Sequence, residues 1–96
     1  MKVRFAAPAS AELDAIYAYI IQHNPEAAQR IKIRIREVAE QLGEFPHIGR
    51  STNRPNIRIR VVTPYRYLIY YAIKDDEVQI LHTHHGARRP PAELVE

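Results

Sequence analysis

The chain has 96 residues, 14 basic and 11 acidic side chains, a formal net charge of +3 and no cysteine. This length fits one domain, and the lack of cysteine excludes a disulfide framework, a thiolate zinc site and a cysteine nucleophile. No segment approaches the roughly 20 apolar residues that a membrane span requires. We therefore expect a single cytoplasmic domain over residues 1–96.

The N-terminal part predicts a short strand followed by a helix. Val3 and Phe5 alternate with charged residues, as in a half-buried strand, and Pro8 then stops strand pairing. From Ala9 to about His23, apolar residues recur at helical spacing, with Ser10 as a candidate cap. These apolar residues are Leu13, Ile16, Tyr17, Ile20 and Ile21.

Asn24-Pro25 predicts the joint to a second helix, because proline disfavours a helical residue before it and fits the first turn of the next helix. In that helix five apolar residues fall at alternating steps of three and four, which predicts a seam buried in the core. They are Ala28, Ile31, Ile35, Val38 and Leu42. Gly43 is placed to act as the C-cap.

After a polar segment from Glu44 to Asn56 the apolar period changes from 3.6 to two, which predicts three strands. They cover residues 57–61, 67–73 and 78–83, and the middle one is apolar on both faces, as in a central strand. The simplest connection is a meander. The predicted fold is an α+β domain of order β-α-α-β-β-β, with a small antiparallel sheet packed against an N-terminal helical hairpin.

Basic residues are concentrated between Glu44 and Asp75, where no acid occurs. The six in this stretch are Arg50, Arg54, Arg58, Arg60, Arg66 and Lys74. Arginine suits bidentate recognition of phosphate or carboxylate, so the pattern predicts an anionic partner, whether RNA, DNA or an acidic protein. A solvated basic face that serves solubility is the alternative.

Five segments, in the right order, resemble the ParE/RelE superfamily of toxins. They are the helical pattern from Ala11 to Ile20, Asn24-Pro25-Glu26-Ala27-Ala28, Pro46-x-x-Gly49-Arg50, Tyr65-Arg66-Tyr67 running into Ile69-Tyr70-Tyr71, and Ile80-Leu81 followed by His85-Gly86-Ala87-Arg88. The resemblance extends from Phe5 to about Pro90. It implies the toxin of a type II toxin–antitoxin system, which arrests growth until a cognate antitoxin of the ParD, RelB or Phd kind binds it.

Two activities divide this superfamily. RelE-like members cleave mRNA on the ribosome, whereas ParE-like members bind DNA gyrase and trap it on DNA without being enzymes. Metal-free RNA cleavage needs a base, an acid and cationic donors for the phosphate. For a nuclease, Arg60 and Arg66 would clamp the phosphate and His85 would be the acid or base. Arg58 shares a strand face with Arg60, because residues two apart on a strand point the same way.

Two features favour the gyrase inhibitor. When Tyr71 is matched to the tyrosine of the family's central strand, Leu68 stands where the nucleases usually have arginine, and it can neither donate a hydrogen bond nor carry charge. The ending from His85 to Arg88 also resembles the ParE branch. A basic nucleic-acid-binding module is a further alternative. The residues predicted to bind a partner are Arg50, Arg58, Arg60, Arg66, His85 and Arg88.

We expect neither a metal ion nor a cofactor. His82, His84 and His85 are better explained as strand-end histidines than as metal ligands, because no cysteine and no suitably spaced carboxylate accompanies them. Tyr71, in the middle of the central strand, is expected in the core.

Overall fold

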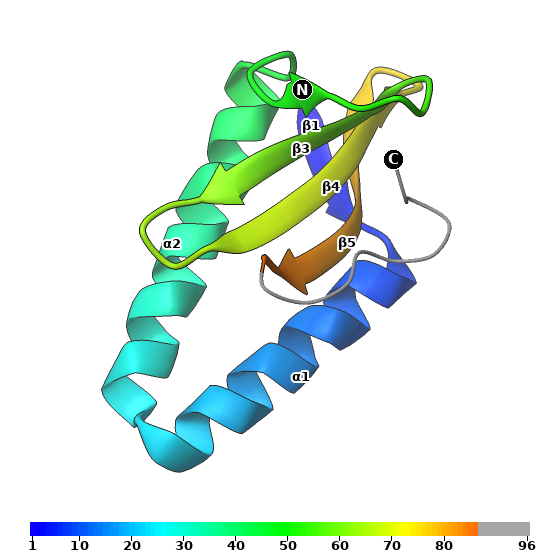
Figure 1. Cartoon of the computed structure of the whole chain (residues 1–96). Helices are drawn as coiled ribbons and strands as arrows, with labels where there is room; N and C mark the ends of the chain where they lie inside the picture. The colour runs from blue at the N-terminus through cyan, green and yellow to red at the C-terminus, as the bar shows by residue number, and fades with distance from the viewer. Residues whose placement is uncertain (87–96) are drawn as a thin grey trace.

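The computed structural model describes residues 1–86 and confirms the predicted α+β class. The elements are β1 (Lys2–Phe5), α1 (Ala7–His23), α2 (Pro25–Glu44), β2 (Arg50–Ser51), β3 (Ile57–Val62), β4 (Tyr67–Lys74) and β5 (Glu77–His85). The strands form one five-stranded sheet in the order β1-β5-β4-β3-β2. Both helices pack against the same face of this sheet (Figure 1).

The sheet is mixed rather than antiparallel throughout. The strands β3, β4 and β5 form the predicted antiparallel meander, but β1 runs parallel to β5 and pairs Lys2 with Glu77 and Phe5 with Ile80. The short β2, which was not predicted, pairs antiparallel with β3. The alternation of apolar residues predicts that a strand exists but not which strand pairs with it, so the parallel pairing of β1 was not predictable. A strand of two residues is too short to show any alternation.

The helix boundaries follow local capping chemistry, with one correction at α1. Pro8 lies in the first turn of α1 and Ala6 is the N-cap, so Ser10 does not cap this helix. At the joint between the helices, the Asn24 side chain accepts a hydrogen bond from the backbone N–H of Ala27 at 3.0 Å. This confirms Asn24 as the N-cap of α2.

Gly43 is not a C-cap, because α2 continues to Glu44 and Phe45 caps it. A Cβ atom at Gly43 would lie 2.7 Å from the backbone oxygen of Met1. Glycine is therefore required here by the close approach of the chain that leads into β1, not by the backbone angles of a helix end.

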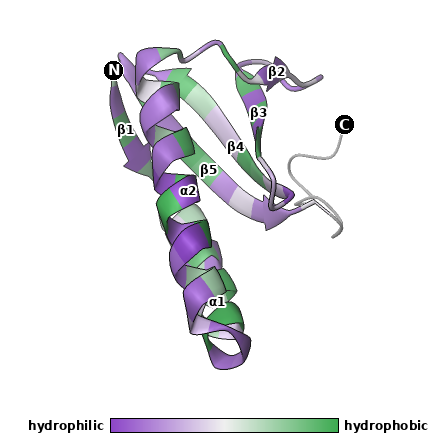
Figure 2. Ribbon diagram, turned by 90° about the vertical axis from the view of Figure 1, so that its left-hand side faces the viewer, coloured by the Kyte–Doolittle hydropathy of each residue, from purple (hydrophilic) through white to green (hydrophobic). Residues whose placement is uncertain are grey.

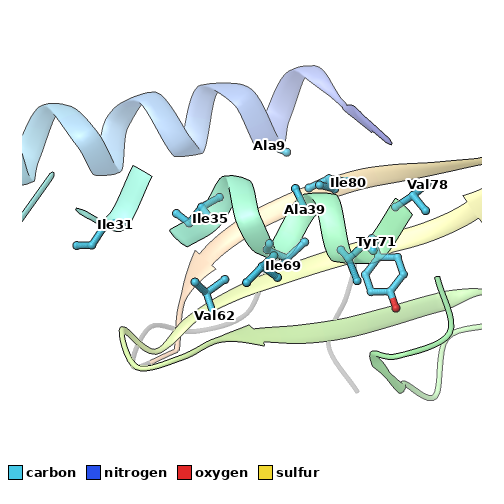
Figure 3. Close-up of a cluster of buried hydrophobic side chains, with 11 residues drawn as sticks. Ala9, Ile31, Ile35, Ala39, Val62, Ile69, Tyr71, Val78 and Ile80 are labelled. Carbon is cyan, nitrogen blue, oxygen red and sulfur yellow. The ribbon is translucent and has the colours of Figure 1, made fainter. Parts of the chain in front are cut away.

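The predicted seam of α2 lies in the core. Its five apolar residues are at most 7% exposed. All of them except Ala28 belong to the core cluster that also contains Ile69, Tyr71, Val78 and Ile80 of β4 and β5 (Figure 3). In α1 only Ala9 is fully buried. Ile21, one of the apolar residues at helical spacing in α1, is 55% exposed.

The tip of the helical hairpin, where α1 meets α2, projects beyond the sheet (Figures 1 and 2). Three large apolar residues of the two helices remain exposed: Tyr19, Ile21 and Ile33. No helix within residues 1–86 is long and apolar enough to cross a membrane.

The first turns of α1 are fastened to β5 beyond the end of β1. The Glu12 carboxylate accepts a hydrogen bond from the Thr83 backbone N–H at 3.2 Å and lies 3.0 Å from His82 Nδ1. The buried Thr83 hydroxyl donates to the Ala9 carbonyl at 3.1 Å. Since β1 pairs with β5 only as far as Ile80, α1 takes over where the strand partner ends.

Candidate partner-binding site

Arg58 and Arg60 lie on the face of the sheet that the helices cover. Their partners across the β3–β4 ladder are Tyr71 and Ile69, which both belong to the main core. Residues directly opposite each other in a ladder share a face. The two arginines therefore do share one face, as their spacing predicts, but they are half-buried on the inner side of the sheet.

The Arg58 guanidinium is already committed to the loop that follows α2. Its Nη1 donates to the carbonyl of His47 at 3.2 Å and to that of Gly49 at 2.7 Å. The Tyr71 hydroxyl donates to the Pro46 carbonyl at 2.7 Å and accepts from the Gly49 N–H at 2.9 Å. A Cβ atom at Gly49 would lie 2.6 Å from the Tyr71 oxygen, so only glycine fits this contact. Two side chains thus hold the Pro46-x-x-Gly49 loop.

Arg60 keeps unused hydrogen-bonding capacity. Its Nε is buried without an acceptor among residues 1–86, and no described acid pairs with its guanidinium. An unmet buried donor costs about 1–3 kcal/mol. Nearby on the same side, Arg34 Nε of α2 donates to the Thr63 carbonyl at 2.8 Å, just beyond the end of β3.

Arg66, Tyr67 and His85 meet at one end of the sheet. Arg66 lies in the turn between β3 and β4 with a φ of 63°, and its carbonyl accepts from the Gly86 N–H at 2.8 Å. The ring of Tyr67 meets the ring of His85 edge-on, with centroids 5.2 Å apart. Arg60 pairs with Ile69, which lies on the same face of β4 as Tyr67 but two residues farther from this end of the sheet.

The other face of the sheet is apolar at its centre. Ile59 and Tyr70 are each 3% exposed and pack with Ile57 and Leu68. Arg50 pairs with Ile59 across the β2–β3 ladder, so its side chain starts from this face. Leu68 is part of the apolar cluster that Ile57, Ile59 and Tyr70 form on this face. Arg88, the remaining predicted binding residue, lies outside the described residues.

A polar cup of about 520 Å³ lies where β2 turns into β3. It is lined by His47, Arg58, Ile73 and residues 51–57. The Thr52 hydroxyl accepts from the Arg54 N–H at 3.1 Å and donates to the Ile57 carbonyl at 3.0 Å, which fixes the turn. Arg54 lies in the acid-free stretch but is not among the residues predicted to bind a partner. Its place in the cup depends on how this turn folds, which the sequence pattern does not show.

A family model described as "ParE toxin of type II toxin-antitoxin system, parDE" matches residues 3–90. The chain belongs to this family. "Toxin RelE2" of Caulobacter vibrioides is 40% identical over 80 residues, which cover 83% of this chain and 89% of that protein. "Putative toxin Y4kP" of Sinorhizobium fredii is 34% identical over 93 residues, which cover 97% and 96%.

A solved structure described as "Chromosomal ParDE TA system from P. aeruginosa" has the same fold as this toxin. The TM-score is 0.69 and the sequence identity 24%, over 88% of this chain and 95% of the other. The family assignment rests on the sequence matches, and this structural likeness supports the fold.

The toxin also has an apolar groove of about 440 Å³ between its two helices, beside β1. Phe5, Leu13 and Tyr17 line it together with Ile35, and charged residues such as Arg36 stand among them. Burial raises the pKa of Tyr17 to about 12, so its phenol stays neutral well above physiological pH. The groove is a second concave surface, distinct from the basic cup.

Within residues 1–86 of the toxin, no three histidine, cysteine or acidic side chains are grouped so that they could hold a metal ion. Of the three histidines near the end of β5, His82 contacts the Glu12 carboxylate and His85 contacts Tyr67. These contacts explain the two histidines without a ligand role.

Proposed function

We propose that this toxin inhibits DNA gyrase in the manner of ParE and is silenced in the cytoplasm by a cognate antitoxin. Ribonucleolytic cleavage would need cationic donors next to an acid or base on a surface that RNA can reach. The observation that supports gyrase inhibition is the environment of Leu68, which packs with Ile59 and Tyr70 on the face opposite the helices. Where a nuclease would have an arginine to hold the phosphate, this toxin has a leucine within an apolar cluster.

The other nuclease candidates fit this proposal. Arg58 is bonded to two loop carbonyls and Arg60 lies on the helix-covered face. Under the proposal, no residue takes part in covalent chemistry, and the binding residues are Arg50, Arg58, Arg60, Arg66, His85 and Arg88.

The antitoxin partner is supported by family membership and by the toxin–antitoxin system named for the solved relative. Apolar anchors should supply most of the affinity, because alanine scans of interfaces show that a few buried side chains dominate. The arginines should supply register and association rate. The groove between α1 and α2 offers such apolar contacts.

Two observations favour mRNA cleavage as the second candidate. Arg66, Tyr67 and His85 lie together at one end of the sheet, and a relative covering most of the chain is named RelE2. A cation, a phenol and an imidazole in one place are the groups that metal-free cleavage uses.

The decisive experiment is induced expression without antitoxin, followed by two assays. We expect growth arrest, intact bulk mRNA by primer extension, and loss of supercoiling when the purified toxin is added to purified gyrase. Co-expression of the antitoxin encoded beside the toxin should restore growth and is the control. Codon-phased cuts in mRNA with unaffected supercoiling would overturn the proposal. Salt-sensitive binding to free DNA or RNA without growth arrest would instead indicate a simple nucleic-acid-binding module.

A further inference from the structure

We infer that the cup at the turn between β2 and β3 binds a phosphodiester group of a nucleic acid. This inference goes beyond inhibition of gyrase and does not depend on it. It assigns a ligand to residues 51–58, which lie between the Pro46-x-x-Gly49-Arg50 and Tyr65-Arg66-Tyr67 motifs.

The cup carries positive charge without compensating acids. The guanidinium groups of Arg54 and Arg58 and the imidazole of His47 line it, and no acidic residue does. The nearest acids along the chain are Glu44 before the cup and Asp75 after it, and neither lines the space. Concave surfaces of one charge sign concentrate the field and attract anions.

Arg58 is oriented in advance. Its Nη1 is held by the carbonyls of His47 and Gly49, while its Nε and Nη2 have no acceptor among residues 1–86. A guanidinium that is already fixed loses little conformational freedom when an anion binds to its remaining donors. The clamp on the Pro46-x-x-Gly49 loop therefore leaves part of this arginine available to a ligand.

The turn that carries Arg54 is also rigid. Five hydrogen-bond contacts join Thr52, Arg54 and Ile57, and Asn56 closes the turn with a φ of 66°. The Arg54 side chain itself is exposed and bonds to no residue of the described chain. Side-chain amides of Asn53 and Asn56 add neutral donors.

The cup is large enough for a phosphodiester group and the sugar next to it. Sites for small molecules have volumes of about 300–1,000 Å³, and the cup has about 520 Å³. Ile57 and Ile73 give it an apolar wall against which a sugar can pack, while the arginines reach the phosphate.

The test compares binding of a short duplex DNA and a single-stranded RNA by the full chain and two charge-matched variants. Arg54→Ser removes one cation from the cup, and Arg30→Ser removes one from an exposed position on α2. We expect R54S to weaken binding about 5- to 20-fold and to lower the slope of log K against log salt by about one. R30S should change affinity less than about twofold. The two nucleic acids show whether DNA or RNA supplies the phosphodiester.

A second measurement locates the ligand and keeps the test independent of folding. In NMR titrations, inorganic phosphate should shift the amide signals of residues 52–58 more than chloride at equal ionic strength, and R54S should reduce these shifts. R54S should melt within about 2 °C of the unmodified toxin, since the Thr52 bonds use only backbone atoms of Arg54.

Equal effects of R54S and R30S on nucleic-acid binding, or phosphate shifts outside residues 52–58, would overturn the inference. The inference would also be overturned if an acidic peptide bound in the cup and neither the DNA nor the RNA did. Inhibition of gyrase by R54S is measured in a separate assay. If the cup does not bind nucleic acid, gyrase inhibition is still tested by that assay. If the toxin does not inhibit gyrase, nucleic-acid binding by the cup is still tested by the titrations.

Discussion

The hydroxyl of Tyr71 accounts for much of the Pro46-x-x-Gly49 motif. It is fully buried, yet it donates one hydrogen bond and accepts another from the loop. Its position in the core was predictable from the apolar run of residues 67–73. Its role in the loop was not, because Gly49 and Tyr71 are 22 residues apart and neither pattern points to the other.

Replacing Tyr71 with phenylalanine tests this role. Loss of the hydroxyl leaves the Gly49 N–H and the Pro46 carbonyl without their partner, so we expect the free energy of unfolding to fall by about 1–3 kcal/mol. Urea denaturation measures the change. The control is Tyr19→Phe, because Tyr19 is 66% exposed and its loss of a hydroxyl should have little effect. Equal destabilisation by both variants would refute the role of the Tyr71 hydroxyl.

Leu68 stands at the position where the nucleases of this superfamily usually have arginine. The structure adds that Leu68 contributes to an apolar cluster with Ile59 and Tyr70. A charge introduced there would have to be accommodated beside buried apolar groups, which is costly without a partner.

At the scale of elements, α2 was the easiest to predict and the attachment of α1 the hardest. The seam of α2, from Ala28 to Leu42, repeats over about four turns of helix, and a pattern that long can be recognised from the sequence. By contrast, α1 is held by Glu12, whose side chain reaches the backbone of Thr83 some 71 residues later. No local pattern marks a glutamate for such a contact.

Glu12→Ala should loosen the junction between α1 and β5. The Thr83 N–H loses its acceptor, so we expect a loss of about 1–2 kcal/mol and faster hydrogen exchange at this amide. Glu12→Gln keeps a side-chain oxygen as acceptor and should retain most of the protection. Glu40→Ala, at an exposed position of α2, is the matched control. The contact is unimportant if Thr83 exchanges at the same rate in all three variants.

For the whole molecule, the parallel pairing of β1 with β5 joins the start of the sequence to the last described strand. The sheet and the packed part of the helices therefore form one cooperative unit. The tip of the hairpin is different, because it projects beyond the sheet and exposes Tyr19 and Ile21 (Figure 2).

This difference predicts two classes of hydrogen exchange in the native toxin. Amides of β4 and β5 should exchange only through global unfolding, whereas those of residues 20–27 should exchange through local opening at lower free energy. Exchange measured at increasing, sub-denaturing urea distinguishes the classes, since global opening depends steeply on denaturant. Equal protection and equal urea dependence at the tip and in β4 would contradict this division.

The sequence by itself determined the local features: the α+β class, the buried seam of α2, the Asn24 cap and the family to which the toxin belongs. These depend on periods and motifs within short stretches, where the physical preferences of the backbone and side chains act directly. Only the tertiary structure decided which face of the sheet holds Arg58 and Arg60, that β1 runs parallel to β5, and that residues 51–58 form a basic cup. Each of these depends on contacts between residues distant in sequence, so the acid-free stretch could predict an anionic partner but could not show where that partner binds.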